Sequence, residues 1–310
     1  MTKTKIEESN SENELYHIPV LFNEVLDGLK IKPNGIYVDC TFGGGGHSLG
    51  ILKQLNNEGK LVAFDQDKDA VKNVYKDDRI VFIHQNFKYL QKFLQLHKIQ
   101  KVDGLLADLG VSSHQFDEGS RGFSIRFDGP LDMRMDSRQQ TTASDVLKQF
   151  SENQLHKMFE LYGEVTNAKT LAKYIVTNRN HSPIQTIEQF KLLISSVVKG
   201  NPNKYFAQVF QALRIEVNQE LSVLEEMLGQ LPNIINKGGR VVIITFHSLE
   251  DRIVKQFFKG INIESENPFE NNQRKIDFKI ITKKPIIASK EESKNNRRSR
   301  SAKLRIFEKL

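Results

Sequence analysis

Short apolar runs alternate with amphipathic stretches along the front of the chain. Four of these runs have the continuous apolar character of strands that are buried on both faces of a parallel sheet. They occupy residues 35–41, 60–64, 80–84 and 102–108. Helical spacing of apolar positions follows each of the first three runs, so the pattern predicts a series of βαβ units.

The alternation stops at Thr142, and signals for helices then follow one another. Ser151 with Gln154, and Thr186 with Gln189, have the spacing of a capping box, in which the hydroxyl residue starts a helix. We therefore expect a block of consecutive helices in this part of the chain.

The strand pattern returns after an apolar stripe at helical spacing through residues 206–224. The later strands are predicted at residues 240–246, after the Gly238-Gly239 turn, and near 276–281 and 303–307. A helical block therefore interrupts an α/β domain. The predicted units are a polar, disordered tail (1–14), a discontinuous α/β domain (15–113 and 213–310) and an inserted all-helical domain for substrate recognition (114–212).

Residues 38–47, with the sequence VDCTFGGGGH, carry the clearest chemical signal. A strand that ends in four consecutive glycines exposes bare backbone to a ligand. Asp65 ends the next strand, about 20 residues further on, where a doubly wound sheet places an acid that binds ribose hydroxyls. A flexible turn would explain the glycines alone, but together with Asp65 they predict a site for an adenosine-containing cofactor.

The glycine register narrows the choice of cofactor. No register matches GxGxxG, which disfavours a dinucleotide, and Ile51 stands where a P-loop requires lysine, which disfavours ATP. S-adenosylmethionine has a ribose and an amino-acid end but no phosphate. It fits close backbone approach and an acid without phosphate-binding parts.

Composition limits the class of protein further. The 310 residues are 38% hydrophobic and include one cysteine, Cys40, which excludes a disulfide framework and favours the reducing cytoplasm. No run approaches the roughly 20 apolar residues of a membrane span. The eight histidines and the cysteine form no zinc-type spacing, so no metal is predicted, and the oligomeric state stays open.

Positive charge is concentrated at one end of the chain. Residues 272–310 hold 13 Lys or Arg against 4 Asp or Glu, a net +9, whereas the whole chain carries +7 and the rest therefore −2. Such a concentration favours a polyanionic partner, with nucleic acid first. The alternative is a solvated tail, for which residues 289–301 are polar enough.

Polar residues follow the fourth and fifth strands, where ligands bind in such sheets. Asp108 holds a ligand or caps the next helix, and Gln115 can pair with an adenine edge or lie in a surface loop. Residues 128–136 order a substrate pocket, or form an interdomain strut in which Arg134 pairs with a carboxylate. His247 can reach the same crevice, although Ser248 with Asp251 also fits a helix cap.

Eight blocks of sequence, in order, carry a family resemblance between residues 17 and 305. They are His17–Leu21, Asp39–Ser48, Asp108–Ser113, Arg121–Ser124, Asp128–Asp136, Arg214–Asn218, Thr245–Arg252 and Ser301–Arg305. The chain closely resembles the bacterial ribosomal RNA small subunit methyltransferase H family. The resemblance implies a Rossmann-like class I methyltransferase sheet with an inserted all-helical domain. It also implies methylation of the exocyclic amine of a cytosine in the decoding region (P site) of 16S rRNA, within the small ribosomal subunit, with S-adenosyl-L-methionine as cofactor.

The resemblance also implies site residues. The cofactor contacts fall on Gly45, Gly46, His47, Asp65, Phe87, Asp108 and Gln115. The acceptor of the amine proton is open, because the chain lacks the Asp/Asn-Pro-Pro-aromatic loop of many amino methyltransferases; Asp108, Ser112 and residues 132–136 are candidates. The candidate RNA contacts are Asp132, Arg134, Asp136, His247, Arg297, Arg298, Arg300, Lys303 and Arg305.

Two other functions fit parts of the sequence. A methyltransferase for another RNA, a protein or a small molecule would share the glycine loop. A protein or small-molecule substrate, however, would not explain the basic C-terminal segment. A non-catalytic RNA-binding assembly factor would need neither the intact loop at residues 45–47 nor Asp65 and Asp108.

Overall fold

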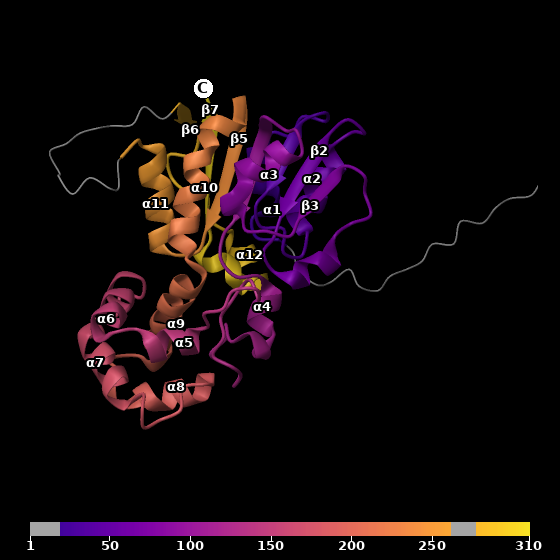
Figure 1. Ribbon diagram of the computed structural model, residues 1–310. Helices are drawn as coiled ribbons and strands as arrows, with labels where there is room; N and C mark the ends of the chain where they lie inside the picture. The colour runs from indigo at the N-terminus through magenta and orange to yellow at the C-terminus, as the bar shows by residue number, and fades with distance from the viewer. Residues whose placement is uncertain (1–18, 262–276) are drawn as a thin grey trace, which may run out of the picture.

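The computed structural model describes residues 19–261 and 277–310, so the predicted tail at 1–14 lies outside it. Its centre is a seven-stranded sheet in the order β3-β2-β1-β4-β5-β7-β6 (Figure 1). The strands are β1 Ile36–Asp39, β2 Lys60–Phe64, β3 Ile80–Ile83, β4 Val102–Asp108, β5 Ile235–Thr245, β6 Phe278–Ile280 and β7 Lys303–Lys309. The neighbours from β3 to β5 are parallel, whereas β7 runs antiparallel to both β5 and β6. The predicted α/β class and all seven predicted strands are confirmed.

β5 begins earlier than its apolar pattern indicates. Ile235 pairs with Val102 and Arg240 pairs with Gly104, so the residues between Ile235 and Arg240 bulge out of the ladder. Gly238 takes a φ of 76° in this bulge, a left-handed conformation that glycine adopts without strain.

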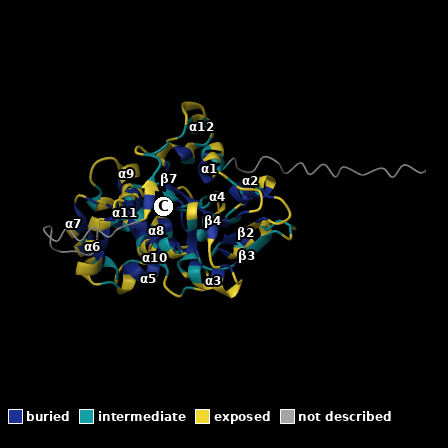
Figure 2. Ribbon diagram, turned by 90° about the horizontal axis from the view of Figure 1, so that it is seen from above, coloured by how far each residue is buried: buried dark blue, intermediate teal, exposed yellow. Residues whose placement is uncertain are grey.

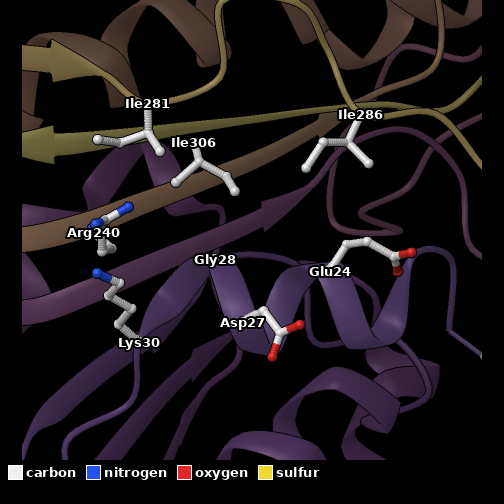
Figure 3. Close-up of a pocket in the computed structure, with 8 residues that line it drawn as sticks. All are labelled: Glu24, Asp27, Gly28, Lys30, Arg240, Ile281, Ile286 and Ile306. Atoms are coloured by element: carbon white, nitrogen blue, oxygen red, sulfur yellow. The ribbon is translucent and has the colours of Figure 1, made fainter.

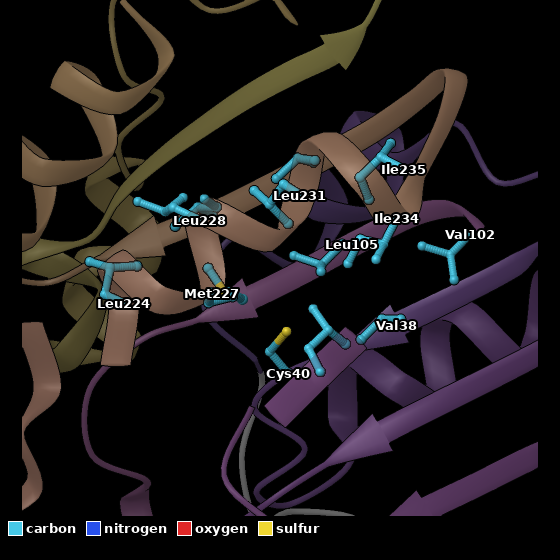
Figure 4. Packing of buried hydrophobic residues seen from close by; sticks show 14 of the residues in the cluster. Val38, Cys40, Val102, Leu105, Leu224, Met227, Leu228, Leu231, Ile234 and Ile235 are labelled. Carbon is cyan, nitrogen blue, oxygen red and sulfur yellow. The ribbon is translucent and has the colours of Figure 1, made fainter. Parts of the chain in front are cut away.

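Helices cover both faces of the sheet because its strands bury both of their faces. Val241 and Ile243 belong to one buried cluster, and the alternate residues Val242 and Ile244 belong to another. The first cluster includes α3 (Leu90–Leu96), α10 (Glu220–Ile234) and α11 (Ser248–Phe258); the second includes α1 (Phe22–Leu29) and α2 (Gly46–Gln54). Figure 4 shows Met227 and Leu231 of α10 lying over Val38, Cys40 and Leu105 of the sheet.

The crossover after β2 differs from the prediction. A helix was expected there, but only the 3₁₀ segment η1 (Lys68–Asn73) forms, started by the side chain of Asp67. After β3, a 3₁₀ turn, η2 (Phe87–Tyr89), precedes α3.

The inserted block has a core of its own. Its helices are α4 Ser113–Asp117, α5 Ala143–Gln149, α6 Glu152–Leu161, α7 Ala168–Asn178, α8 Ile187–Ile194 and α9 Pro202–Asn218, with the 3₁₀ segments η3 (Gly119–Arg121) and η4 (Ser195–Val197). Buried apolar residues from Phe123 to Val217 form one cluster here. The capping boxes predicted at Ser151 and Thr186 are present, and in Figure 1 the block lies below the sheet.

The apolar stripe through residues 206–224 spans two helices rather than one. Gln219 takes a φ of 52° between α9 and α10 and so redirects the chain from the helical block back to the sheet. Asn218, just before this break, accepts a hydrogen bond from the Met135 amide at 2.7 Å and donates one to the Met133 carbonyl at 2.8 Å. These bonds tie residues 128–136 to the end of α9.

The basic end of the chain forms α12 (Lys290–Asn295) and η5 (Arg297–Ser301) before β7. In Figure 1 this segment lies beside α4, and in Figure 2 α12 stands out from the body of the protein and is largely exposed. Within the described residues, no helix is long and apolar enough to cross a membrane.

A cavity of about 340 Å³ lies between α1 and the strands β5 and β7 (Figure 3). Gly28 of α1, Ile306 of β7 and Arg240 of β5 contribute to its lining, and Arg240 binds Glu308 at 2.7 Å. None of the predicted site residues lines this cavity.

Candidate functional site

The residues predicted to bind a ligand gather at the carboxyl edge of the sheet. The glycine loop follows β1, Asp65 follows β2, Asp108 ends β4 and His247 follows β5. This edge is where open α/β sheets bind ligands.

Hydrogen bonds to residues outside the glycine loop fix its backbone conformation. The Gly43 amide donates to Asp65 Oδ2 at 2.7 Å, and Asn73 donates to the Gly43 carbonyl at 3.0 Å. A Cβ on Gly44 would meet no atom within 4 Å, so this stretch of backbone faces open space. The loop therefore offers bare main chain to a ligand.

Packing also requires glycine at the next two positions. Gly45 has a φ of 78°, and a Cβ there would lie 2.9 Å from Phe42 and Tyr75. A Cβ on Gly46, the first residue of α2, would collide with the ring of Pro19. Gly43 and Gly44 thus leave the loop backbone exposed, whereas Gly45 and Gly46 allow close packing at its base.

Asp65 anchors the loop from the second strand. Its carboxylate accepts from the amides of Gly43 and Asp67, at 2.7 and 2.8 Å. The pKa of Asp65 is raised to about 6, chiefly by burial and also by the charges of Asp67 and Asp39, while these hydrogen bonds act against the rise. Each carboxylate oxygen keeps a lone pair for a ribose hydroxyl.

Gln115 links two walls of the site rather than standing free. Its Oε1 accepts from the Ser112 amide at 3.0 Å, completing the capping box of α4, and its Nε2 donates to Asp67 Oδ2 at 2.7 Å. Ser112 itself is the N-cap, with its hydroxyl accepting from the Gln115 amide. Arg121 Nη1 lies 2.8 Å from the same Asp67 oxygen. The buried Gln115 side chain therefore fixes α4 against the loop after β2.

His47 and Asp108 form the centre of the site. Buried His47 places Nε2 3.0 Å from the Val20 carbonyl, so Nε2 carries the proton and Nδ1 is left as an acceptor, 3.7 Å from Asp108 Oδ2. Burial lowers the pKa of His47 to about 4, so the ring is neutral at pH 7.

Asp108 keeps an unused polar atom. Its Oδ1 is buried without a hydrogen-bond partner among the described residues, although the side chain as a whole is 24% exposed. Burial raises the pKa of Asp108 to about 8, with smaller contributions from Asp39 and Glu250. An orphaned oxygen in a native site indicates a missing donor, and a ligand in the crevice would supply it.

Phe87 begins η2 after β3 and is only partly buried. Its ring packs against the cluster under α3 and α10. The preceding Asn86 caps η2 and donates to Gln66 at 2.8 Å, which fixes the start of η2 and so the position of Phe87.

The turn after β5 corrects one predicted cap. His247, not Ser248, is the N-cap of α11, and it forms a capping box with Glu250. Glu250 accepts from the amides of Phe246 and His247 at 2.7 and 3.3 Å, and its other oxygen lies 3.2 Å from His247 Nε2. Asp251 is occupied elsewhere, by Arg305.

A group of possible metal ligands also forms at this turn, although sequence spacing indicated none. One ligand atom each from Glu220, His247 and Glu250 lie within 4.8 Å of one another. Both oxygens of Glu220 are bound by Arg214 at 2.9 Å, and Glu250 caps α11. Each carboxylate therefore already has a partner from the protein.

The acidic segment at 128–136 is built from local pairs. Arg134 binds both oxygens of Asp132, each at 2.7 Å, and Asp136 pairs with Arg138 at 2.8 Å. Arg134 thus pairs with a carboxylate, as the strut alternative expected, but that carboxylate lies two residues away in the same segment. The tie to α9 is made instead by Asn218, which the sequence analysis quoted only within a motif.

The C-terminal basic residues are not equivalent. Arg305 is 7% exposed and binds Asp251 at 2.7 and 3.2 Å, so it is withdrawn from the candidate phosphate contacts. Lys303 lies 3.8 Å from the same carboxylate. Arg297 and Arg300 are exposed, and Arg298 lies against α4.

The strand order, the antiparallel β7 and a glycine loop followed by an acid after β2 define a class I methyltransferase. More specifically, the chain belongs to the MraW methylase family, whose family model matches residues 14–310.

Close relatives cover almost the whole chain. A protein of Azobacteroides pseudotrichonymphae named "Ribosomal RNA small subunit methyltransferase H" is 53% identical over 298 residues, covering 95% of this chain and 98% of that one. Proteins of the same name from Christiangramia forsetii and Bacteroides thetaiotaomicron are each 50% identical over 297 residues, covering 95% of this chain and 98% and 97% of theirs. Among solved structures, a putative rRNA methylase from Clostridium thermocellum aligns with 12% identity and a TM-score of 0.44, covering 95% of this chain and 100% of that one.

Proposed function

We propose that this protein transfers a methyl group from S-adenosyl-L-methionine to the exocyclic amine of one cytosine in the decoding region (P site) of 16S rRNA, within the small ribosomal subunit in the cytoplasm. The observation that carries the proposal is the 50–53% identity, over nearly full length, to proteins named Ribosomal RNA small subunit methyltransferase H.

The chemistry of the site fits the proposed cofactor. The open backbone at Gly44 suits the amino-acid end, Asp65 has acceptor capacity for ribose hydroxyls, and the partly exposed Phe87 suits one face of adenine. Ile51 stands where a phosphate-binding lysine would be needed. When bound, S-adenosylmethionine supplies an electrophilic methyl group on a sulfonium.

Neutral His47 suits that positive charge. Its pKa of about 4 keeps a second cation out of the crevice at pH 7. Asp108 and Asp39 bring carboxyl groups, not cations, to the same edge of the sheet.

The amine of cytosine needs positioning more than proton removal. Its lone pair is conjugated with the ring, so hydrogen-bond acceptors must draw it toward tetrahedral geometry in line with the methyl group. After transfer the nitrogen is acidic and releases a proton to a modest base. Asp108 is the proposed acceptor, because its Oδ1 has no internal partner and its pKa of about 8 lies close to working pH. Ser112 is the weaker candidate, since its hydroxyl already caps α4.

A methyl-transfer assay tests the proposal against its alternatives. Small subunits from cells that lack this modification are incubated with labelled cofactor and the protein, and the rRNA is digested to nucleosides. We expect one labelled cytidine per particle, methylated on its exocyclic nitrogen. Label on another RNA or on protein would support a methyltransferase with a different substrate. Tight binding to the subunit without label would support a non-catalytic assembly factor.

A further inference from the structure

Arg126 and Phe127 form an exposed pair that the sequence analysis did not single out. Phe127 is 49% exposed, and Arg126 beside it is exposed as well. The Cβ of Phe127 lies 3.3 Å from where a Cβ on Gly119 would stand. The pair is therefore seated on η3, directly after α4.

Arg298 reaches the same place from the other end of the chain. Its guanidinium lies over the ring of Phe116, 5.6 Å from the centroid, and Nη2 is 3.2 Å from Asp117. Burial, and then the nearby charge of Arg126, lowers the pKa of Arg298, while Asp117 acts against them. Arg298 therefore contacts the end of α4, and Phe127, the neighbour of Arg126, packs on Gly119 just beyond it, so the two arginines from distant segments share this part of the surface.

Asp117 offsets part of the charge of Arg298, but two other neighbouring acids are engaged elsewhere. Asp128 turns toward α8, where it accepts from the Glu188 amide at 3.0 Å, and Glu118 binds the Ser120 hydroxyl at 2.8 Å. Like charges held together on a surface indicate an anion that binds both.

The basic segment also borders the candidate site. The Leu21 amide donates to Glu292 of α12 at 2.8 Å, and the preceding Val20 holds His47. At its other end the segment contacts α4, the helix that Ser112 caps. The segment therefore reaches from the start of α1 to α4, beside the candidate site.

We propose that Arg126, Phe127 and Arg298 form an RNA-binding surface beside the candidate site, where the two guanidinium groups bind the RNA backbone and Phe127 stacks on a base that flanks the target nucleotide. The proposal rests on the proposed function and adds the residues that hold the RNA. Paired arginines match phosphate geometry, and an exposed aromatic ring next to them is the usual platform for an unpaired base. An acidic peptide would use the arginines but leave Phe127 without a role.

The test compares single variants with matched controls. Arg126→Gln and Phe127→Leu change exposed side chains of the surface, Phe127→Tyr keeps an aromatic ring, and Lys173→Gln and Leu192→Ala are controls at exposed positions on α7 and α8. For each, we would measure the dissociation constant for unmodified small subunits across a salt series, cofactor binding by calorimetry, and the melting temperature.

Arg126→Gln should weaken subunit binding and reduce the slope of log K against log salt by about one. Phe127→Leu should weaken binding about tenfold, and Phe127→Tyr should restore it. Cofactor binding and melting should stay as in the wild type, and the two controls should behave as the wild type throughout.

The outcomes distinguish failure of the proposed RNA-binding surface from failure of the proposed methyltransferase function. If the wild-type protein methylates subunits but both surface variants bind them as tightly as the controls do, the surface is wrong and the proposed function stands. If the wild type transfers no methyl group to subunits, the proposed function fails first. Equal loss in Phe127→Leu and Phe127→Tyr would overturn the stacking role, and loss of poly-glutamate binding without loss of RNA binding would assign the surface to an acidic protein.

Discussion

Replacing Asp108 with asparagine separates its proposed role as proton acceptor from the cost of burying its carboxyl group. Asp108→Asn keeps the size of the side chain but removes the ionisable group whose pKa burial raises to about 8. If the carboxylate accepts the amine proton, the wild-type rate depends on its ionised fraction. That fraction is about 9% at pH 7 and about 91% at pH 9, so single-turnover methyl transfer should rise about tenfold over this range.

The same residue should make the ligand-free protein less stable as pH rises. The pKa of Asp108 in the folded protein lies above the ordinary value of 3.8, so unfolding releases a proton between about pH 4 and pH 8. Stability contributed by the neutral carboxyl is therefore lost as pH rises through this window. Asparagine does not titrate, so Asp108→Asn should be the more stable protein at pH 8, by about 1–3 kcal/mol for relief of one poorly solvated buried group.

The assays are single-turnover transfer to unmodified small subunits from pH 6.5 to 9.5, and thermal melting of the ligand-free protein at pH 5 and pH 8. Asp108→Asn should lose the rising limb of the rate profile and gain stability mainly at the higher pH. His47, with a pKa of about 4, titrates below the pH range of the rate assay and so does not contribute to the pH–rate profile. A flat wild-type profile, or a variant that melts lower than wild type at pH 8, would refute the reasoning.

Three further substitutions test other parts of the site. Arg305→Ala should destabilise the protein by about 1–3 kcal/mol in urea denaturation, because among the described residues Asp251 then keeps only Lys303, at 3.8 Å, as an ion-pair partner. The salt slope of RNA binding should stay unchanged, and a reduced slope would return Arg305 to the phosphate contacts. Gln115→Leu removes the bond to Asp67 and should raise the KM for the cofactor about tenfold with little change in kcat; an unchanged KM would mean that α4 needs no such link. Wild-type affinity for the cofactor should fall as pH drops through about 6, since only the ionised carboxylate of Asp65 accepts hydrogen bonds from both the ribose and the glycine loop. Asp65→Asn should weaken cofactor binding and remove this pH dependence. Calorimetry at pH 5 and pH 8 measures both effects, and a variant whose affinity still changed with pH would contradict the prediction.

Elements that depend on near neighbours in the chain were predictable. β4 was expected at residues 102–108 and lies there, since an apolar run between polar ends is a local pattern. The capping boxes at Ser151 and Thr186 join residues three apart, so their spacing alone identifies them. The gathering of Asp65 and Asp108 at one edge follows from the parallel order of the strands, which fixes where strand ends lie.

Features that need a distant partner were missed or misassigned. Arg305 looked like a phosphate contact because charge along a sequence does not reveal burial, and its partner Asp251 reaches it only when β7 packs beside β5. The meeting of Arg298 with Phe116 likewise appears only once the C-terminal segment crosses to α4.

The sequence by itself determined the strands, the helical block and the candidate ligand-binding edge, because apolar period, capping and glycine spacing act over a few residues. The family followed from the resemblance of eight motif blocks. The tertiary structure alone decided which charges are buried, which polar atoms lack a partner and which surfaces combine segments from the two ends of the chain. Those properties depend on desolvation and on contacts between residues far apart in sequence, and neither is encoded in local spacing.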